Sequence, residues 1–325
     1  MRIHRLSFVL CFALVACSNP EPVQPDIAPQ EVLQRATRAA KTLESAQYVL
    51  QGEFDSKTDA LSALGTVRMD GMLAGGGEQL RFQMDLTADM ESIEGNSSLT
   101  GTLEVVVISE EEVYMNIRSL VSQPSSALFQ PELIATLAGQ WWLLSEDDTP
   151  PMAESVTPDP RLLQAQAQVV SVTRDRGVVS IDGRDVHHYD VALDKIKLAE
   201  YLSAVALEKG VDFDTKETTD AIEEIQASGQ LWIDAETYYV QKINWVVQSM
   251  PLDNGGTASI SFTVNFRSHN NAPAILPPTG AKQFSPGLLY TLPSKALFPE
   301  ELRNQIPAEY SDEDLFEVLQ QMNSY

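Results

Sequence analysis

Two stretches of the chain alternate apolar and polar residues with a period of two. In QLRFQMDLTADM, residues 79–90, every second residue from Leu80 to Met90 is apolar. In TASISFTVNF, residues 257–266, the same alternation runs from Ala258 to Phe266. Successive side chains of a β-strand point to opposite faces of a sheet, so each stretch predicts a strand with one apolar and one polar face.

Further segments carry this pattern less regularly, and they follow one another with short connections. They are residues 47–54, 64–73, 98–108, 113–117, 141–144, 168–173, 178–181, 186–193, 229–234 and 238–248. Strands at regular spacing with short connections favour an antiparallel meander over a parallel sheet. The sequence therefore predicts one large antiparallel sheet in a single domain.

Helical spacing interrupts the strand pattern in several places. Residues 27–44 carry Val32, Ala36, Ala39, Ala40 and Leu43 at intervals of three and four, and this alanine-rich stripe suits close packing on a sheet. Other predicted helices cover residues 131–139, 194–209, 218–225 and 312–322. The fold class expected from these patterns is α+β, mainly antiparallel β.

The N-terminus has the layout of a secretory signal. Arg2, His4 and Arg5 form a short basic region, and residues 6–16 are apolar apart from Ser7. The apolar run is shorter than the ~20 residues that a transmembrane helix needs. We therefore expect residues 1–16 to be an export signal that is removed.

The signal ends in Leu14-Val15-Ala16-Cys17, which resembles the lipobox of bacterial lipoproteins. In that family the cysteine thiol receives a diacylglyceryl group, the chain is cut before the cysteine, and the new N-terminus usually takes another acyl chain such as palmitate. The resemblance implies that Cys17 is the lipidated first residue and anchors the protein to a membrane. A plain signal peptide with an incidental cysteine is the alternative.

Residues 17–29 carry four prolines, Pro20, Pro22, Pro25 and Pro29, and predict an extended tether. We expect a folded body over residues 30–281 and a proline-rich C-terminal extension with a short helix over residues 282–325. Because Ser18 and not aspartate follows Cys17, the sorting preference of the lipoprotein family implies the outer membrane if the cell has one. Otherwise it implies the outer face of the plasma membrane.

The chain is strongly acidic, with 46 Asp and Glu against 22 Lys and Arg. Removing the signal takes away Arg2 and Arg5, so the mature charge is 20 − 46 = −26. This charge argues against nucleic acid or an anionic membrane surface as a partner of a basic patch.

The cysteines and histidines predict no metal site. Cys11 lies in the signal and Cys17 is the expected lipidation site, so the folded body has no thiol for a disulfide, a metal or catalysis. His187 and His188 are neighbours on a predicted strand and point to opposite faces, which keeps them from sharing a metal. We expect no cofactor.

Sequence motifs of enzymes are missing from the chain. It contains no G-x-S-x-G, no glycine-rich phosphate loop, no H-E-x-x-H and no C-x-x-C. The run Gly75-Gly76-Gly77 lacks a following helix and lysine and predicts a hairpin turn. Ser294-Lys295 stands in a proline-rich stretch that gives no sign of a desolvated catalytic amine. We expect a protein that is not an enzyme, with a hydrolase of unrecognised site as an alternative.

The anchored signal, the N-terminal helix, the long meander and the late helices together resemble the LolA-like carriers and the LppX/LprG type of lipid-binding lipoproteins. The likeness covers roughly residues 27–281, and three stretches carry it: GR and HYDV at 183–184 and 188–191, LWID at 231–234, and the proline-containing end of the sheet at 266–281. The resemblance implies a strongly curved, unclosed half-barrel sheet whose concave face is covered by helices and binds acyl chains. Residues 283–325 depart from it.

Eleven apolar residues are expected to point to the concave face and bind lipid: Phe82, Met84, Leu86, Val105, Val107, Met115, Ile243, Trp245, Phe262, Val264 and Phe266. Met, Phe, Trp and Val suit adaptable contacts with acyl chains. The function expected is that of a cell-envelope lipoprotein that binds or carries a lipid, or the acyl chains of another lipoprotein. The alternative is a structural or sensory module in which the same residues form a filled core and the protein acts through protein contacts.

Overall fold

A computed structural model describes residues 27–92, 95–109, 111–124, 131–144, 167–209, 222–223, 225–252 and 256–284. The predicted signal peptide, Cys17, most of the tether and the predicted helix at 312–322 lie outside these residues. The same holds for most of the predicted helix at 218–225.

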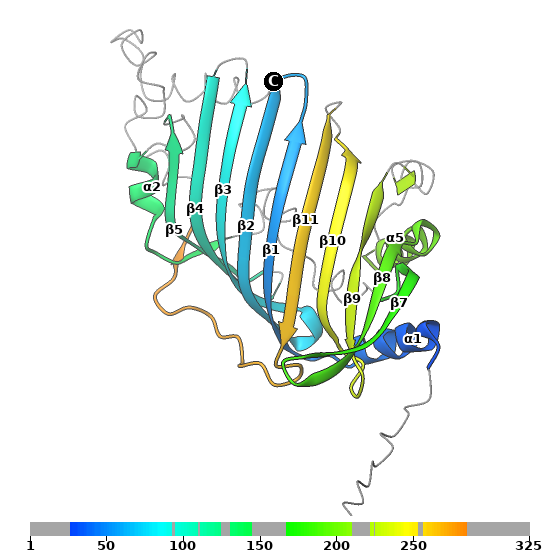
Figure 1. The fold of residues 1–325 in the computed structure, drawn as a ribbon. Helices are drawn as coiled ribbons and strands as arrows, with labels where there is room; N and C mark the ends of the chain where they lie inside the picture. The colour runs from blue at the N-terminus through cyan, green and yellow to red at the C-terminus, as the bar shows by residue number, and fades with distance from the viewer. Residues whose placement is uncertain are drawn as a thin grey trace, which may run out of the picture.

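The described residues build a single twelve-stranded sheet (Figure 1). In chain order its strands are β1 (Ala46–Lys57), β2 (Leu61–Ala74), β3 (Gln79–Ser92), β4 (Gly95–Val107), β5 (Val113–Gln123), β6 (Trp142–Leu144), β7 (Val170–Ile181), β8 (Arg184–Leu193), β9 (Gln226–Asp234), β10 (Val240–Pro251), β11 (Thr257–Arg267) and β12 (Lys282–Gln283). Their order across the sheet is β12-β6-β5-β4-β3-β2-β1-β11-β10-β9-β8-β7.

Every neighbouring pair is antiparallel except β12 with β6, which is parallel. Strands β1 to β6 and β7 to β11 form two consecutive meanders, and β1 joins them by pairing with β11 from Gln47↔Arg267 to Lys57↔Thr257. The first strand of the fold thus lies at the centre of the sheet, and the predicted meander is confirmed.

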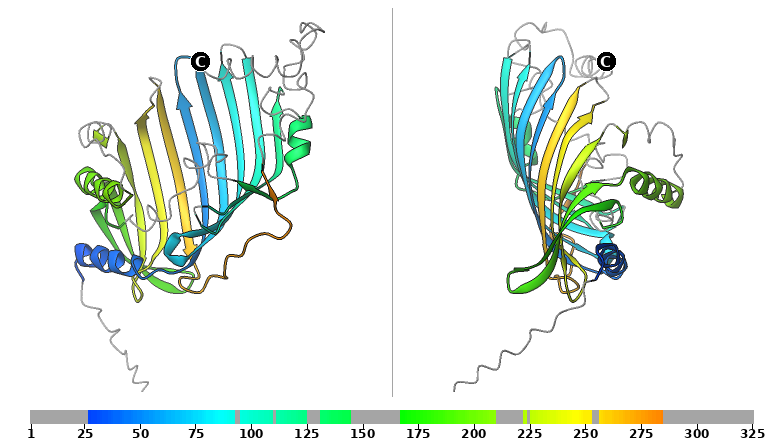
Figure 2. Two further views of the ribbon diagram at one scale, coloured as in Figure 1. Left: turned by 180° about the vertical axis from the view of Figure 1, so that it is seen from behind. Right: turned by 45° about the vertical axis from the view of Figure 1, so that its right-hand side comes forward.

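The sheet is strongly curved and its two edges do not meet (Figure 2). Helix α1 (Pro29–Ala40) and helix α5 (Lys195–Lys209) lie on its concave side, whereas the short helix α2 (Pro131–Leu137) packs beside β5, near one edge of the sheet. The predicted fold class, a mainly antiparallel α+β half-barrel that stays open, is therefore confirmed.

Helix α1 is shorter than the pattern suggested, because it starts at Pro29 and ends at Ala40 instead of covering 27–44. Proline suits the first helical turn, where its missing N–H is not needed. Val32, Leu33 and Ala36 are buried against the sheet, so the predicted stripe does face it.

Strand β7 joins two segments that the pattern kept apart, 168–173 and 178–181. Its pairing with β8 shifts between Val172 and Arg174 and again between Asp175 and Val178. The charged residues between these segments occupy the irregular part, which hid the continuity of the strand. The Gly75–Gly77 turn lies between β2 and β3, as predicted.

The core lies mostly on the concave face. One buried cluster joins α1 to eight strands, and Tyr48, Tyr189, Ile243 and Val264 are among its members. A smaller cluster lies on the convex face, where Ile275 packs on Val106 and Tyr114. Ile275 belongs to residues 268–281, which run from the end of β11 to β12 and are called the strap below.

Candidate functional site

All eleven residues predicted for the concave face do lie on one face of the sheet. Directly paired residues share a face, and the pairs Phe82↔Val105, Val105↔Met115 and Ile243↔Val264 belong to this one. Strands β1 and β2 lie between the two groups of predicted residues. They add Tyr48, Leu50, Val67 and Met69 to the same face, which the sequence prediction did not include.

The structure brings only part of the predicted set into one cluster. Six of the residues are buried members of the large cluster with α1: Phe82, Met84, Ile243, Trp245, Val264 and Phe266. Val105 and Phe262 are partly buried against that cluster, and Val107 packs instead on the small cluster of Ala46, Leu73 and Leu80. Leu86 and Met115 lie on the same face and are half-buried.

Burial along this face is graded. Val264 is 0% exposed and Ile243 is 1% exposed, so the middle of the face has no free surface at these positions. Leu86, Val105 and Phe262 keep part of their surface accessible. The inner face therefore combines a filled core with a partly accessible apolar surface.

Glycines on this face make room for large side chains of the neighbouring strands. A Cβ on Gly71 would lie 2.5 Å from the ring of Tyr48, and one on Gly65 would lie 2.3 Å from the ring of Phe54. A Cβ on Gly229 would lie 2.1 Å from the Asn244 carbonyl oxygen and 3.1 Å from the Trp245 ring. Glycine in a strand interior marks a bend or a close approach, and here it lets an aromatic ring lie flat across the next strand. The sequence already contains a sign of these close approaches, because the three glycines stand at positions of the strand alternation that are otherwise apolar.

Helix α1 is fixed to the inner face by one polar contact besides its apolar stripe. The Arg35 guanidinium donates to the Tyr238 hydroxyl at 2.6 Å and lies 5.0 Å from the centre of the same ring. His187 continues this row, stacked between Tyr238 and Tyr189. Burial lowers the pKa of His187, with a smaller lowering from the charge of Arg35 and an opposing effect of Asp175.

Helix α5 covers the inner face near β7 and β8. Leu198 and Tyr201 pack against the large cluster, while Ile196 and Leu207 are 73% and 84% exposed. Asp194 precedes the helix, and its carboxylate accepts from the backbone N–H of Lys197 at 3.2 Å and from the Ser171 hydroxyl at 2.8 Å. Hydrogen bonds of Asp194 thus hold the start of the helix, while the side chains of Ile196 and Leu207 remain in solvent.

The titratable groups of the inner face include two buried phenols. Burial raises the pKa of Tyr48 and of Tyr189 far above the ordinary value, so both phenols stay protonated at neutral pH. Among the residues that the structure describes, no three His, Cys, Asp or Glu side chains are grouped to hold a metal ion. Within the same residues no helix is long and apolar enough to cross a membrane.

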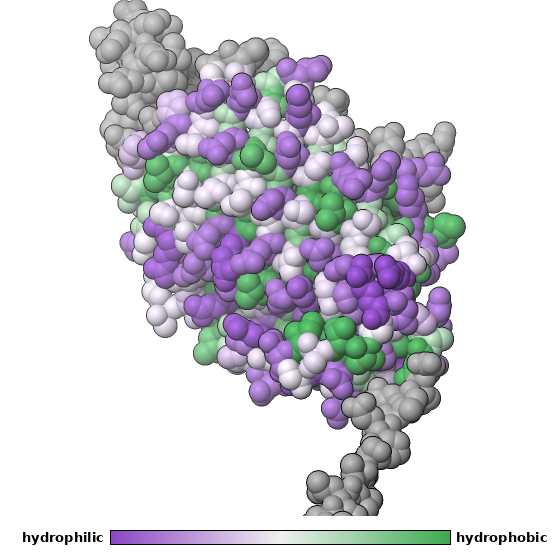
Figure 3. Space-filling model, viewed as in Figure 1, coloured by the Kyte–Doolittle hydropathy of each residue, from purple (hydrophilic) through white to green (hydrophobic). Residues whose placement is uncertain are grey.

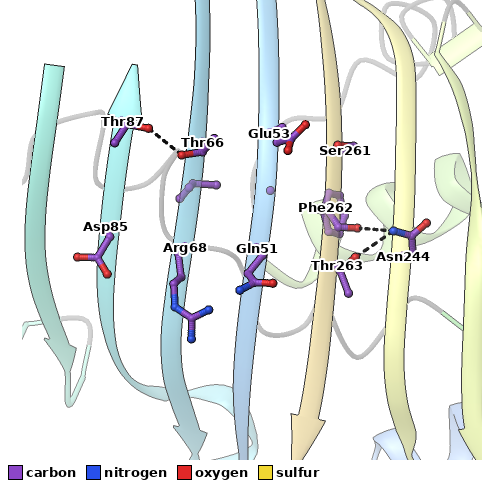
Figure 4. Close-up of a pocket in the computed structure, with 12 residues that line it drawn as sticks. Gln51, Glu53, Thr66, Arg68, Asp85, Thr87, Asn244, Ser261, Phe262 and Thr263 are labelled. Carbon is purple, nitrogen blue, oxygen red and sulfur yellow. Dashed lines mark hydrogen bonds between the residues drawn. The ribbon is translucent and has the colours of Figure 1, made fainter. Parts of the chain in front are cut away.

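The convex face is mostly polar, with scattered apolar patches (Figure 3). Its centre forms an open groove of about 500 Å³ lined by Gln51, Glu53, Thr66, Arg68, Asp85, Thr87, Asn244, Ser261 and Thr263 and reached by Gly52, Val67 and Phe262 (Figure 4). Thr66 and Thr87 are joined at 2.7 Å, and the Asn244 amide donates to the Thr263 hydroxyl at 3.0 Å. These two pairs satisfy part of the polar groups of the groove, which resembles an ordinary solvated strand face.

No protein-family model and no curated protein matches the chain. Among solved structures it is similar to LprF from Mycobacterium bovis, with 15% identity over 78% of this chain and 97% of that one, at a TM-score of 0.38. It is also similar to the lipoprotein LppX from Mycobacterium tuberculosis, with 12% identity over 77% of this chain and 100% of that one, at a TM-score of 0.33.

A LolA superfamily protein from Nitrosomonas europaea shares 11% identity over 76% of this chain and 96% of that one, at a TM-score of 0.23. LppX and the LolA superfamily are the groups that the sequence resembles. Identities and TM-scores of this size transfer no ligand and no activity to this chain.

Proposed function

We propose that this protein is a membrane-anchored lipoprotein that binds or carries a lipid, or the acyl chains of another lipoprotein, on the concave face of its sheet. The observation that carries the proposal is the apolar face itself, which runs across the sheet from β5 to β8 and stays partly accessible around Leu86, Val105 and Phe262. Such a surface gains free energy when it covers an acyl chain, at about 25 cal/mol per Å² of apolar area removed from water.

Anchoring at Cys17 belongs to the same proposal and rests on the sequence Leu-Val-Ala-Cys. A signal over 1–16, a tether over 17–29 and a body over 30–281 place the sheet in the cell envelope, close to a membrane that supplies lipid. Each CH2 of a buried acyl chain contributes ~0.8 kcal/mol, so two or three chains anchor the protein stably.

A role without catalysis agrees with the inner face. Its tyrosines are kept protonated by burial, and His187 is kept neutral at pH 7 by its lowered pKa. Catalytic groups are usually tuned toward the working pH, and these pKa values move away from it.

The decisive experiment places a large side chain on the accessible part of the inner face. Leu86→Trp on β3 occupies space that an acyl chain needs, and Thr87→Trp is the matched control, because Thr87 is its neighbour on the exposed convex face. We expect lipid recovered by solvent extraction, and uptake of added fatty acid or phospholipid, to fall for Leu86→Trp alone. Both variants should melt close to the wild type.

The second candidate, a module with a filled core that acts through protein contacts, is favoured by the full burial of Val264 and Ile243. If the filling extends to Leu86, then Leu86→Trp costs about 1–3 kcal/mol of stability, as overpacked cores do. A strongly destabilised variant, together with a wild type that neither contains nor takes up lipid, would decide for this candidate.

A further inference from the structure

The tip of the β7–β8 hairpin, the start of β10 and the end of β11 lie at the same end of the sheet (Figures 1 and 2). Residues at these three places line a pocket. Its volume is about 440 Å³, within the range of small-molecule sites. Of the eleven residues predicted to bind lipid only Phe266 lines it, so this pocket is separate from the accessible part of the inner face.

Two arginines from different strands line the pocket. The Arg184 side chain on β8 is 64% exposed, and its contact with Asp234 is long, at 3.5 Å. Arg267 at the end of β11 is exposed and has no ion-pair partner within the described part of the chain. In a protein of formal charge −24, two available guanidinium groups in one pocket favour an anion there.

The remaining wall is held by side-chain contacts and offers groups that can hydrogen-bond to hydroxyls. The rings of Tyr239 and His269 stack with their centres 5.0 Å apart, and the Tyr239 hydroxyl accepts from the Asn270 amide at 2.8 Å. The carboxylate of Asp182 and the side chain of Asn271 also line the pocket. An acidic group beside two arginines opposes a bare anion but accepts hydrogen bonds from a polyol.

The backbone around the pocket is held in an uncommon conformation. Tyr238 and Ser268 have positive φ angles of 61° and 55°, a region that residues other than glycine rarely adopt. Asp182 and Asn270 do so at 50° and 55°, which these two residue types tolerate more easily. Ser268 and Asp182 line the pocket, and the other two flank lining residues. Strained residues that gather in one place indicate a site whose geometry is fixed by the fold.

We infer that this pocket binds a phosphorylated polyol, with the phosphate between Arg184 and Arg267 and the hydroxyls toward Asp182 and Asn271. A phosphate presents two non-bridging acceptor oxygens as a diester and three as a monoester, enough in either case for two guanidinium groups from separate strands. The phosphorylated polyol can be the headgroup of a phospholipid such as phosphatidylglycerol, or a free phosphate ester such as glycerol 3-phosphate. The inference does not depend on lipid binding to the inner face.

Calorimetry on the full-length protein with sn-glycerol 3-phosphate tests the inference, with glycerol as the uncharged reference. Each of Arg184→Gln and Arg267→Gln should weaken binding by about tenfold or more, the usual effect of losing a hydrogen bond to a charged group. Arg81→Gln on β3 removes the same charge outside the pocket and should leave binding nearly unchanged. Loss of affinity with Arg81→Gln equal to that with the pocket variants would overturn the inference.

Asp182→Asn separates a binding role from a structural one, because asparagine tolerates the positive φ of this turn. Without the carboxylate, inorganic phosphate should bind more tightly, and the advantage of glycerol 3-phosphate over phosphate should shrink. Weaker binding of both probes would contradict the assigned roles.

The two sources are distinguished with vesicles and the Cys17→Ser chain, which lacks its own anchor. Sedimentation with phosphatidylglycerol vesicles that disappears in Arg267→Gln assigns the pocket to a headgroup. Binding of glycerol 3-phosphate without sedimentation assigns it to a free ester. A wild type that binds neither probe has no such site.

Discussion

At the scale of single residues, the inner face depends on glycines as much as on large apolar side chains. Tyr48 is 2% exposed, and its ring lies where a side chain at position 71 would stand. A large residue beside a glycine covers the backbone of the next strand, which lets the sheet bend while its core stays filled.

Gly71→Ala should therefore lower the free energy of unfolding by ~1–3 kcal/mol, because its Cβ overlaps the Tyr48 ring. Chemical denaturation measures this cost. In a Tyr48→Leu background the same substitution should cost less, since contacting residues are not additive. Equal costs in both backgrounds would show that the ring is not what excludes the methyl group.

The described histidines of the body predict how stability depends on pH. Burial is the main cause that lowers the pKa of His187, His188 and His269 below the ordinary value of 6.5. Below pH 6.5 these histidines become protonated in the unfolded chain, whereas in the folded protein they stay neutral until the pH reaches their lowered pKa values. Stability is therefore complete above pH 6.5 and declines as the pH falls through 6.5 toward the lowered folded values.

Denaturation midpoints measured from pH 8 to pH 5 should show this decline, and His269→Gln should make it shallower. The carboxylates Asp190 and Asp194 have lowered pKa values, mainly through hydrogen bonds from Arg176 and Ser171. Their contribution is lost only as the pH falls below the ordinary value of 3.8, so the two effects separate along the pH axis. Stability that stays constant between pH 8 and pH 5 would contradict the histidine prediction.

At the scale of elements, α5 depends on the cap at its start. Asp194→Ala removes the acceptor of the Lys197 N–H and should cost about 0.5–2 kcal/mol. Hydrogen exchange should speed up in α5 before it does in the sheet, because Ile196 and Leu207 of this helix are 73% and 84% exposed. Glu200→Ala, an exposed change in the same helix, should leave exchange unaltered.

The element scale also shows what the sequence pattern can and cannot predict. A period of two fixes which residues share a face, and all eleven predicted residues do so. It does not determine how deeply each side chain is buried, so the sequence pattern does not distinguish fully buried Val264 from half-buried Leu86. How deeply a residue is buried depends on α1 and on the order of strands. The pairing of β1 with β11 joins residues 200 to 220 positions apart through contacts that no local pattern records.

At the scale of the whole molecule, β1 bonds to β2 on one side and to β11 on the other, so the two meanders share one ladder. A protease site inserted between residues 150 and 160 should yield two fragments that elute together from a sizing column. Denaturant should be needed to part them. Fragments that separate and stay folded in buffer would show two independent domains in place of the single body predicted over residues 30–281.

The strap crosses the convex side of the sheet, with Ile275 buried on Val106 and Tyr114, and ends where β12 pairs with β6. A tie along the outside of an arch has a definite mechanical effect. Further curling lengthens the outer path, which a chain of fixed length cannot follow, whereas flattening leaves the tie slack. The strap thus ties the end of the second meander to the far strands of the first across the outside of the arch, and the fully extended length of its residues 268–281 is the limit to which the arch can curl while Ile275 and β12 stay in place.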